Sequence, residues 1–546
     1  MSSGTNEFDY VIVGAGSAGC VLAYRLGADP NNRVLVLEAG GPDTDPMIHI
    51  PLGLGRMHEV RAHDWGYDSE PEPHLGNREI EAMRGKVVGG SSSINVMAYV
   101  RGHRGDYDRW AQKGATGWSY ADILPYFRRM ETWEEGGDTW RGGDGPLHTQ
   151  RARSTDPLWD GWVDAGNAMG FGHTEDYNGE KQEGLGRSQS TIHEGKRESA
   201  ARAYLRPALR GRNVSLRTGA YVTRVVMDGV RATGIEYMRL GRRHVVHAAK
   251  EVILSGGVFN SPQLLMLSGI GPADHLREVG IEPVIDSPYV GGNLQDHLAV
   301  HVTASRRAPP GPFRREMRFD RMATSMVRAQ LFSSGPATVL PGGLHGFVKT
   351  RPELATTDVQ FLFRGAPANA HLWFPGIRPP YRDGFGVRPV LLHPSSRGEV
   401  RLRSADPFDK VRIVQNFLEA PGDIETLRTG VKLARDMLHR SEMDRFRDTE
   451  ITPGPGVKTD ADIDAWIRRT ALTAHHPSCT TPMGTDERAV LDPECRVRGA
   501  ENLRVVDASA MPDLVSGNIN AAVMLIAEKV SDHILGRTPL APARDA

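Results

Sequence analysis

Two short segments near the C-terminal end carry side chains that could together handle a proton. Ala474-His475-His476-Pro477 supplies two histidines, and Asn518-Ile519-Asn520 supplies two amides further along. A histidine, with an unperturbed pKa of about 6.5, suits a general base, and such a base contributes roughly 10²–10⁴-fold to a rate. Taken with the Gly-rich N-terminal segment, these residues indicate an active site at the face of a bound redox cofactor.

The N-terminal segment has the pattern of a dinucleotide-binding unit. Asp9–Val13 is a short apolar run typical of a buried strand, and Gly14-Ala15-Gly16-Ser17-Ala18-Gly19 leads into a helical pattern that ends at Leu26. A second apolar run, Arg33–Leu37, ends at Glu38, which is placed to accept hydrogen bonds from an adenosine ribose. The pattern predicts a dinucleotide site but does not separate FAD from NAD.

The three glycines of this turn have separate predicted roles. Gly14 permits a tight turn, Gly16 lets backbone N–H groups approach a pyrophosphate, and Gly19 lets the helix pack on the sheet. The helix N-terminus favours the negative charge of the pyrophosphate. An ordinary Gly-rich turn would explain the glycines but would leave Glu38 without a role.

Further motifs follow in a fixed order along the chain. This ordered set resembles the glucose-methanol-choline (GMC) family of flavoprotein oxidoreductases, of the choline dehydrogenase-like type, and the matching segments extend from about Asp9 to Ile534. The motifs are Arg84–Asn95, Tyr99–Gly102, Asp106–Trp110, Ser255–Gly257, Ser261–Leu265, Ser268–Pro272, Gly292–His297, Leu503–Ser509 and Met511-Pro512.

The resemblance implies an FAD-dependent enzyme that oxidises an alcohol, expected to be a primary one, to an aldehyde or ketone. His476 matches the family's catalytic histidine before proline, and Asn518 matches the second catalytic position. His476 is expected to take the hydroxyl proton while hydride passes to the flavin N5 and Asn518 positions the oxygen. His297, in Gln295-Asp296-His297, is expected to be structural.

The substrate pocket and the electron acceptor are less closely defined by the sequence. His475, Ala474 and Phe363 are predicted to line the pocket around the small-molecule alcohol. A quinone or dye is the favoured acceptor, and oxygen use by an oxidase that produces hydrogen peroxide is the first alternative. A hydroxynitrile lyase, which keeps FAD without redox turnover, is the second alternative.

The cofactor is expected to be noncovalent FAD. Some GMC enzymes tether the flavin through a histidine in the Gly/Ser-rich loop, and the matching position here is Ile94, which cannot form that bond. No metal site is expected. The residues predicted to bind FAD are Gly14, Gly16, Ser17, Ala18, Gly19, Glu38, Ala39, Trp65, Val88, Gly90, Ser91, Asn95, Val96, Met97, Val222, Asp507, Ala508 and Asn520.

The expected fold class is α/β (α+β overall), with a discontinuous Rossmann-like FAD-binding domain and a second, substrate-binding domain built on an antiparallel sheet. Alternating patterns at Asp358–Phe363 and Gly398–Arg403 predict strands of that sheet, which the family resemblance places over the flavin. The predicted FAD-binding segments are 1–155, 211–300 and 465–546, and the predicted substrate-binding segments are 156–210 and 301–464.

Composition narrows the function classes. The 546 residues exceed what one core normally supports, and 66 Lys+Arg against 67 Asp+Glu leave no nucleic-acid footprint. Met1–Asp9 shows no secretory signal, and the apolar run Ala521–Ala527 is too short to span a bilayer. We therefore expect a cytoplasmic enzyme, with reduced thiols at Cys20, Cys479 and Cys495.

One arginine-rich segment lies outside these motifs. Arg306–Arg328 is rich in arginine among Pro, Phe and Met, which fits a solvated surface segment or a lid that contacts an anionic membrane near a quinone acceptor.

A nicotinamide dehydrogenase would share Gly14–Glu38 but has no use for the Gly85–Asn95 loop. A serine hydrolase is disfavoured because Ala15–Gly19 lacks the first glycine of a nucleophile elbow.

Overall fold

A seven-stranded sheet is built around the N-terminal strand β1 (Glu7–Val13) in the computed structural model, which describes residues 7–367 and 369–544. Residues 10–13 are buried, as expected of a central parallel strand covered on both faces. The strand order is β10-β11-β12-β1-β2-β9, and β24 also pairs with β12. These strands are β2 (Val34–Leu37), β9 (Val214–Arg217), β10 (Tyr221–Asp228), β11 (Arg231–Arg239), β12 (Arg242–Leu254) and β24 (Leu503–Val505).

The long strand β12 changes partners along its length. Its first half pairs antiparallel with β11, and its second half runs parallel to β1 and β24. Strands from three distant parts of the chain therefore end side by side at the same edge. This arrangement agrees with the predicted α/β fold class and places the segments that follow β1, β12 and β24 next to one another.

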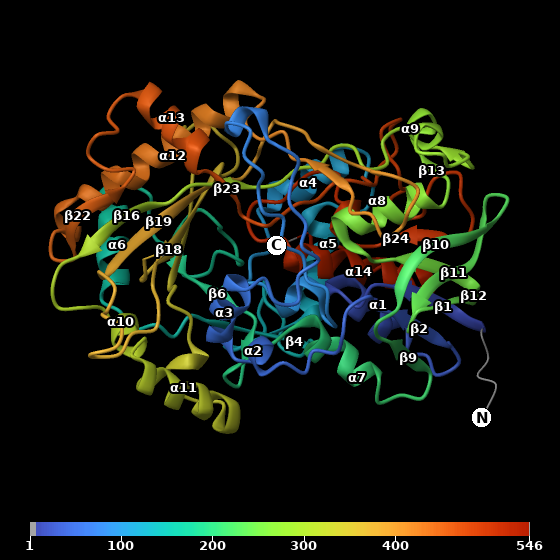
Figure 1. Ribbon diagram of the computed structural model, residues 1–546, viewed down its shortest axis with the longest axis horizontal. Helices are drawn as coiled ribbons and strands as arrows, with labels where there is room; N and C mark the ends of the chain where they lie inside the picture. The colour runs from blue at the N-terminus through green and yellow to red at the C-terminus, as the bar shows by residue number, and fades with distance from the viewer. Residues whose placement is uncertain (1–6, 368, 545–546) are drawn as a thin grey trace.

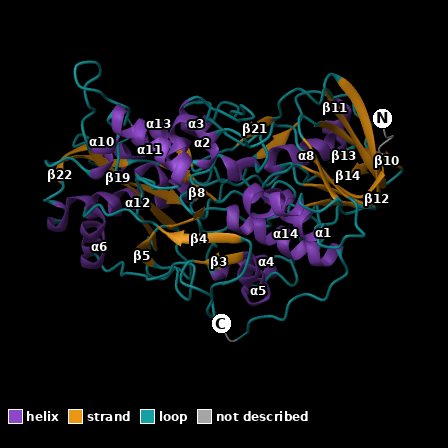
Figure 2. Cartoon of the chain, turned by 90° about the horizontal axis from the view of Figure 1, so that it is seen from below, coloured by secondary structure: helices purple, strands orange, loops and turns teal. Residues whose placement is uncertain are grey.

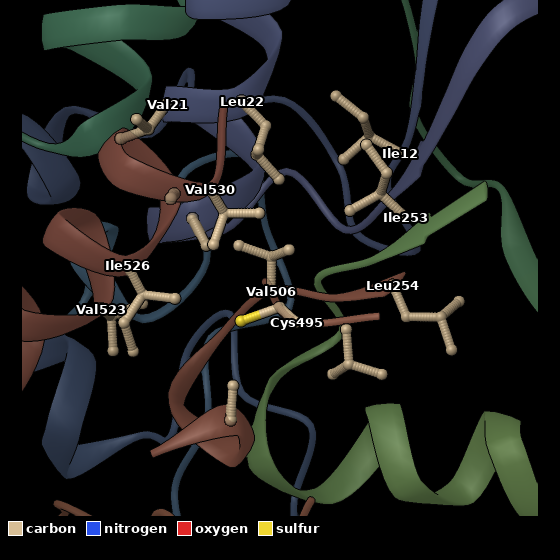
Figure 3. Close-up of a cluster of buried hydrophobic side chains, with 14 of the residues drawn as sticks. Ile12, Val21, Leu22, Ile253, Leu254, Cys495, Val506, Val523, Ile526 and Val530 are labelled. Carbon is tan, nitrogen blue, oxygen red and sulfur yellow. The ribbon is translucent and has the colours of Figure 1, made fainter. Parts of the chain in front are cut away.

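Two helices from opposite ends of the chain cover one face of this sheet. α1 (Ser17–Leu26) packs against α14 (Asn520–Ile534), and Figure 3 shows Val21 and Leu22 of α1 in the same buried cluster as Ile526 of α14. At the edge of the contact, Ser17 Oγ donates a hydrogen bond of 2.7 Å to Asn520 Oδ1. The contact brings the start of α14 beside the Gly-rich turn.

An eight-stranded antiparallel sheet forms the other half of the molecule (Figure 1). Seen from below in Figure 2, β19 and β22 lie at the opposite end from β10, β11 and β12. The order is β22-β16-β19-β18-β17-β5, and β15 joins β19 to β23. The strands are β5 (Gly184–Arg187), β15 (Leu298–Ala299), β16 (Val302–Arg306), β17 (Leu344–Val348), β18 (Val359–Arg364), β19 (Gly384–Leu391), β22 (Arg447–Thr452) and β23 (Leu472–Thr473).

The helix α12 (Pro421–His439) covers one face of the antiparallel sheet. A Cβ added to Gly430 of this helix would lie 3.3 Å from Val359 of β18 and 3.5 Å from Pro389 of β19, so these two side chains face the helix. Side chains alternate along a strand, so the intervening residues point to the opposite face. That opposite face borders the large cavity described below.

One strand predicted for this sheet lies elsewhere. Asp358–Phe363 corresponds to β18, but within Gly398–Arg403 only β20 (Glu399–Arg401) is a strand, and it pairs with β21 (Arg412–Val414) in a separate two-stranded sheet. This hairpin packs on α8 (Gly257–Leu267), where Val400 shares a buried cluster with Val258. The alternating pattern predicted the strand but carries no information about its partner.

The remaining helices surround the two sheets, and no helix among residues 7–367 and 369–544 is long and apolar enough to cross a membrane. The predicted domain boundaries stay a prediction; β15, at the end of segment 211–300, pairs within the antiparallel sheet. The helices not yet given bounds include α3 (Leu54–Glu59), α4 (Arg104–Gln112), α5 (Tyr120–Met130), α6 (Leu158–Ala168), α9 (Ala273–Glu278), α10 (Pro312–Glu316), α11 (Phe319–Phe332) and α13 (Asp460–Thr470).

Candidate active site

A cavity of about 240 Å³ runs along the Gly-rich turn at the carboxyl ends of β1, β2 and β12. Segments that follow these strands meet there, as expected for a dinucleotide site in an open parallel sheet. Fifteen of the residues predicted to bind FAD line it, namely Gly14, Gly16, Ser17, Ala18, Glu38, Ala39, Trp65, Gly90, Ser91, Asn95, Val96, Val222, Asp507, Ala508 and Asn520.

The backbone at the Gly-rich turn explains two of its glycines. Gly14 has φ +99°, and a Cβ there would lie 2.4 Å from the Ser255 carbonyl oxygen. A Cβ on Gly16 would meet nothing closer than the Gly90 Cα at 4.0 Å, so this position is open to the cavity. The turn therefore leaves room for a pyrophosphate against its backbone.

Two carboxylates in the cavity wall accept hydrogen bonds from nearby backbone and side-chain groups. Glu38 accepts hydrogen bonds from the backbone N–H groups of Ala15 and Gly40, at 2.9 and 2.8 Å, and burial raises its pKa to about 7. Burial also raises the pKa of Asp507, which accepts from the Gly257 N–H and from the hydroxyl groups of Ser261 and Ser509. Both therefore shape the wall, and Glu38 keeps unused lone pairs for a ribose.

Three residues predicted to bind FAD, Gly19, Val88 and Met97, do not line this cavity, and their role stays a prediction. A Cβ on Gly19 would lie 1.9 Å from the Gly14 carbonyl oxygen, so this glycine serves close packing of α1 against the turn. Val88 is 4 % exposed and belongs to the hydrophobic core, and Met97 is fully buried. A sequence motif defines such a loop but carries no information about which of its side chains face a cavity.

The predicted catalytic pair meets at the end of the cavity. Asn518 Nδ2 lies 2.9 Å from His476 Nε2, and both residues are at most 8 % exposed. His475 and Ala474, predicted for the substrate pocket, also line the cavity. The packing of α14 against α1 places Asn518 at this end of the cavity, and the segment after β23 carries His476.

The other ring nitrogen of His476 contacts a second histidine that the sequence prediction treated as structural. His297 Nδ1 lies 2.9 Å from His476 Nδ1, and His297 Nε2 lies 3.1 Å from the Leu392 carbonyl oxygen. His297 therefore acts on the predicted catalytic residue directly, as a positioning residue. The only sequence signal was its place in the motif Gln295-Asp296-His297.

This chain of contacts determines the proton positions. Burial lowers the pKa of His297 to about 3, so the ring is neutral. The Leu392 oxygen can only accept, so His297 Nε2 carries the proton and His297 Nδ1 accepts from His476 Nδ1–H. His476 is then left with an unprotonated Nε2 that accepts from the Asn518 amide.

Burial and nearby positive charge keep His476 neutral. Its pKa lies well below the ordinary value, first through burial and then through His297 and the guanidinium of Arg84. The Asp296 carboxylate accepts from the His476 backbone N–H at 2.8 Å and fixes the backbone, while burial raises its own pKa to about 6. His476 Nε2 is thus available as a proton acceptor at neutral pH.

Arg84 is a residue of this site that the sequence prediction omitted. It lines the cavity, its Nη2 donates to the His475 carbonyl oxygen at 2.9 Å, and burial lowers its pKa. It begins the Arg84–Asn95 motif, which was the available signal. Its charge acts on both His475 and His476.

A second cavity, of about 1930 Å³, meets the first at Ala474, His475 and Asn518. Among the described residues, the Asn518 Oδ1 and His475 Nδ1 atoms at this junction have no hydrogen-bond partner. Phe363 borders the second cavity, although its ring packs on Trp162 at 5.1 Å. A substrate in the second cavity could therefore reach His476 and a cofactor held in the first.

The fold and the two cavities define a dinucleotide-dependent enzyme with a neutral histidine and an asparagine beside its cofactor cradle. Family models described as GMC oxidoreductase match residues 8–299 and 394–527. The chain belongs to the GMC oxidoreductase family, and it is an FAD-dependent oxidoreductase acting on CH–OH donors.

Relatives of known name cover almost the whole chain. It is 45% identical over 538 residues to the oxygen-dependent choline dehydrogenase of Brucella ovis, covering 98% of this chain and 97% of that one. A protein of the same name from Sinorhizobium fredii is 45% identical over 537 residues, with the same coverage. Pyridoxine 4-oxidase from Mesorbium loti superposes with a TM-score of 0.87 at 31% identity, covering 97% and 100% of the two chains.

A formate oxidase from Aspergillus oryzae superposes with a TM-score of 0.89 at 27% identity, covering 98% of this chain and 99% of that one. The similarity therefore extends over both halves of the molecule.

The contact between the two histidines predicts different reduction rates for two substitutions of His297. His297→Leu removes the acceptor for His476 Nδ1–H, so the proton redistributes to Nε2 and flavin reduction by substrate slows by about 10–100-fold. His297→Gln keeps an acceptor for His476 and a donor for the Leu392 oxygen, so the rate stays within a few-fold of wild type. Stopped-flow absorbance of the flavin measures both.

The pH dependence separates this positioning role from a general loss of structure. The pKa of His476 lies below its ordinary value, so acidification protonates the base only well below about pH 6.5. The wild-type and Gln rate constants should therefore be constant from about pH 9 to about pH 7. A wild-type inflection at or above pH 7, or equal rates for the Leu and Gln variants, would contradict the assignment.

Proposed function

We propose that the protein oxidises a primary alcohol to an aldehyde, with His476 as the general base. The observation that supports this most is the 2.9 Å contact between Asn518 Nδ2 and His476 Nε2 at the junction of the two cavities. A substrate hydroxyl group that replaces this direct contact would accept from the amide and donate to the imidazole. Asn518 lines both cavities, while His476 lines the smaller one.

The residues divide the work of the reaction. Bound FAD would supply the hydride acceptor, which takes two electrons and one hydrogen from the alcohol carbon. His476 Nε2 accepts the hydroxyl proton, and the Asn518 amide holds the oxygen so that this proton points at the base. Arg84, which lines the same cavity and donates to the His475 carbonyl oxygen at 2.9 Å, would stabilise the negative charge that develops on the oxygen.

The residues that would hold FAD are those that line the smaller cavity. Gly16 leaves the backbone open to the pyrophosphate, Glu38 offers lone pairs to the ribose, and Ser17 begins the helix whose N-terminus faces the phosphates. Asn518 precedes α14, and Asn520 is the first residue of that helix. We also propose that segments 1–155, 211–300 and 465–546 form the FAD-binding domain, because they carry the residues that line the smaller cavity. Segments 156–210 and 301–464 would then form the substrate-binding domain.

Anaerobic bleaching of the flavin tests the proposed reaction. A panel of primary alcohols should reduce the bound flavin, and His476→Ala should slow reduction by about 10²–10⁴-fold. His244→Ala, at an exposed histidine on β12, serves as the matched control and should reduce at the wild-type rate. Unchanged reduction in His476→Ala would refute the role of the base. No bleaching by any alcohol would favour the hydroxynitrile lyase instead.

We propose that FAD is bound noncovalently. Ile94 lies in the wall of the smaller cavity at the position of the family's tethering histidine, and its side chain has no nucleophilic atom. Acid precipitation of the purified protein should leave the yellow cofactor in the supernatant. A yellow pellet, with a flavin-labelled peptide after digestion, would contradict this.

For the electron acceptor, we propose a quinone at an anionic membrane surface, with oxygen as the alternative that the relatives' name raises. The segment α10–α11 turns Phe313, Met317, Met322 and Met326 toward the larger cavity. Its outer side exposes Phe319, Val327, Leu331 and Phe332, which are 56–71% exposed, among the basic residues Arg314, Arg315, Arg318, Arg321 and Arg328. An apolar and basic surface of this kind suits peripheral binding to anionic lipid.

Vesicle co-sedimentation tests this surface. The wild type should pellet with anionic vesicles at low salt and be released by high salt, and the double variant Leu331→Glu/Phe332→Glu should stay in solution. Leu240→Glu, at an 89% exposed leucine after β11, is the matched control and should still pellet. Equal sedimentation of both variants, or none by the wild type, would remove the membrane from the proposal. Oxygen uptake followed in parallel with a dye assay compares the two acceptors.

We further propose a cytoplasmic location. All three cysteines are free and buried, which fits a reducing compartment.

A further inference from the structure

The face of the antiparallel sheet that borders the larger cavity carries His345 and Arg388 on either side of Leu362. Leu362 of β18 pairs with His345 of β17 on one side and with Arg388 of β19 on the other, so these three side chains share one face. Val359 and Pro389, on alternate positions, face α12. His345, Leu362 and Arg388 all line the larger cavity.

Two guanidinium groups lie on this face without a carboxylate partner. Arg364, two residues after Leu362, points to the same side and lines the same cavity. In the described part of the chain, neither Arg364 nor Arg388 has a carboxylate oxygen within 4.0 Å. The Arg388 Nη2 donates to the Thr473 carbonyl oxygen at 2.7 Å, and its Nε has no hydrogen-bond partner among the described residues.

The two arginines increase the positive potential at this end of the cavity. The pKa of Arg388 is lowered to about 10, first by burial and then by repulsion from Arg364. His345 adds an 8 % exposed ring whose Nδ1 has no partner among the described residues. An anion bound here would relieve the repulsion and give partners to these donors.

The acidic residues that line the cavity do not pair with these two guanidinium groups in the described part of the chain. Glu59, Glu134 and Glu194 border the cavity, but their carboxylates already pair with other arginines, namely Arg56 at 2.8 Å, Arg153 at 3.2 Å and Arg202 at 3.7 Å. Near the catalytic pair, Asp296 accepts from the Thr473 hydroxyl and the His476 N–H, and its charge offsets part of the repulsion on Arg388 without pairing with that guanidinium. A quaternary ammonium group would therefore be repelled at this sheet face. Sites that bind such cations offer aromatic rings or unpaired carboxylates instead.

We infer that the preferred substrate is a hydroxycarboxylate: a primary alcohol whose other end is a carboxylate bound by Arg388 and Arg364. This inference rests on the proposed alcohol oxidation at His476. A planar guanidinium fork matches a carboxylate in a bidentate geometry, and the junction of the two cavities lets the hydroxyl end reach His476 while the acid end stays on the sheet. Oxidation converts the CH₂OH end to an aldehyde, with the proton passing to His476 and the hydride to FAD, and leaves the carboxylate unchanged.

The test compares three classes of substrate in the FAD-bound enzyme with a dye acceptor. A short series of ω-hydroxycarboxylates is measured against 1-alkanols of the same chain length and against choline. The best hydroxycarboxylate should exceed its alkanol by about 10–100-fold in kcat/KM, and choline should fall below the alkanol. An alkanol or choline that equals or exceeds every hydroxycarboxylate would overturn the inference, without any variant being needed.

Variants locate the binding site of the acid. Arg388→Met should lower kcat/KM for the hydroxycarboxylate by about 10–100-fold, mostly through KM, and Arg388→Lys should recover part of the loss. Arg351→Met removes an exposed arginine after β17 and should leave the hydroxycarboxylate preference unchanged. Equal losses for hydroxycarboxylate and alkanol in Arg388→Met would overturn the inference.

A binding measurement separates this inference from the catalytic proposal. Calorimetric titration of the enzyme with a saturated carboxylate, which has no hydroxyl group to oxidise, should give saturable binding that Arg388→Met weakens by about 10-fold or more. Absence of binding would count against the anion site. If no alcohol reduces the flavin, the proposed function fails; if alkanols reduce it without any preference for hydroxycarboxylates, only the present inference fails.

Discussion

A single carbonyl oxygen, that of Leu392, determines which nitrogen of the predicted catalytic histidine is free. It accepts from His297 Nε2, which leaves His297 Nδ1 to accept from His476 Nδ1–H, and His476 Nε2 then faces Asn518 as a bare acceptor. Burial keeps both rings neutral, because charging either one would place an unpaired cation in the interior. The site is therefore a proton acceptor before any substrate arrives.

The site depends on both sheets, because the residues of this hydrogen-bonded series come from different halves of the molecule. Leu392 follows β19 of the antiparallel sheet, and His476 follows β23 at the same sheet. Asn518 precedes α14, which is fixed against α1 and hence against the Gly-rich turn. Packing of the two halves thus sets the distance between the base and the cofactor cradle, and the same sheet carries Arg388 on the face that borders the larger cavity.

Local patterns in the sequence predicted much of this arrangement, and the failures have physical reasons. The turn from Gly14 to Gly19 and the strand at Asp358–Phe363 were predictable because their signals are local. The partner of β20 was not, because alternation defines a strand and not its neighbour. The contact of His297 with His476 depends on two rings 179 residues apart, and no short motif describes such a distance.

Neutron diffraction of the FAD-bound enzyme at neutral pH tests the central claim most directly, because it locates individual protons. We predict density for deuterium on His476 Nδ1 and on His297 Nε2, and none on His476 Nε2. Deuterium on His476 Nε2, or on both nitrogens of that ring, would contradict the assignment of His476 as the base.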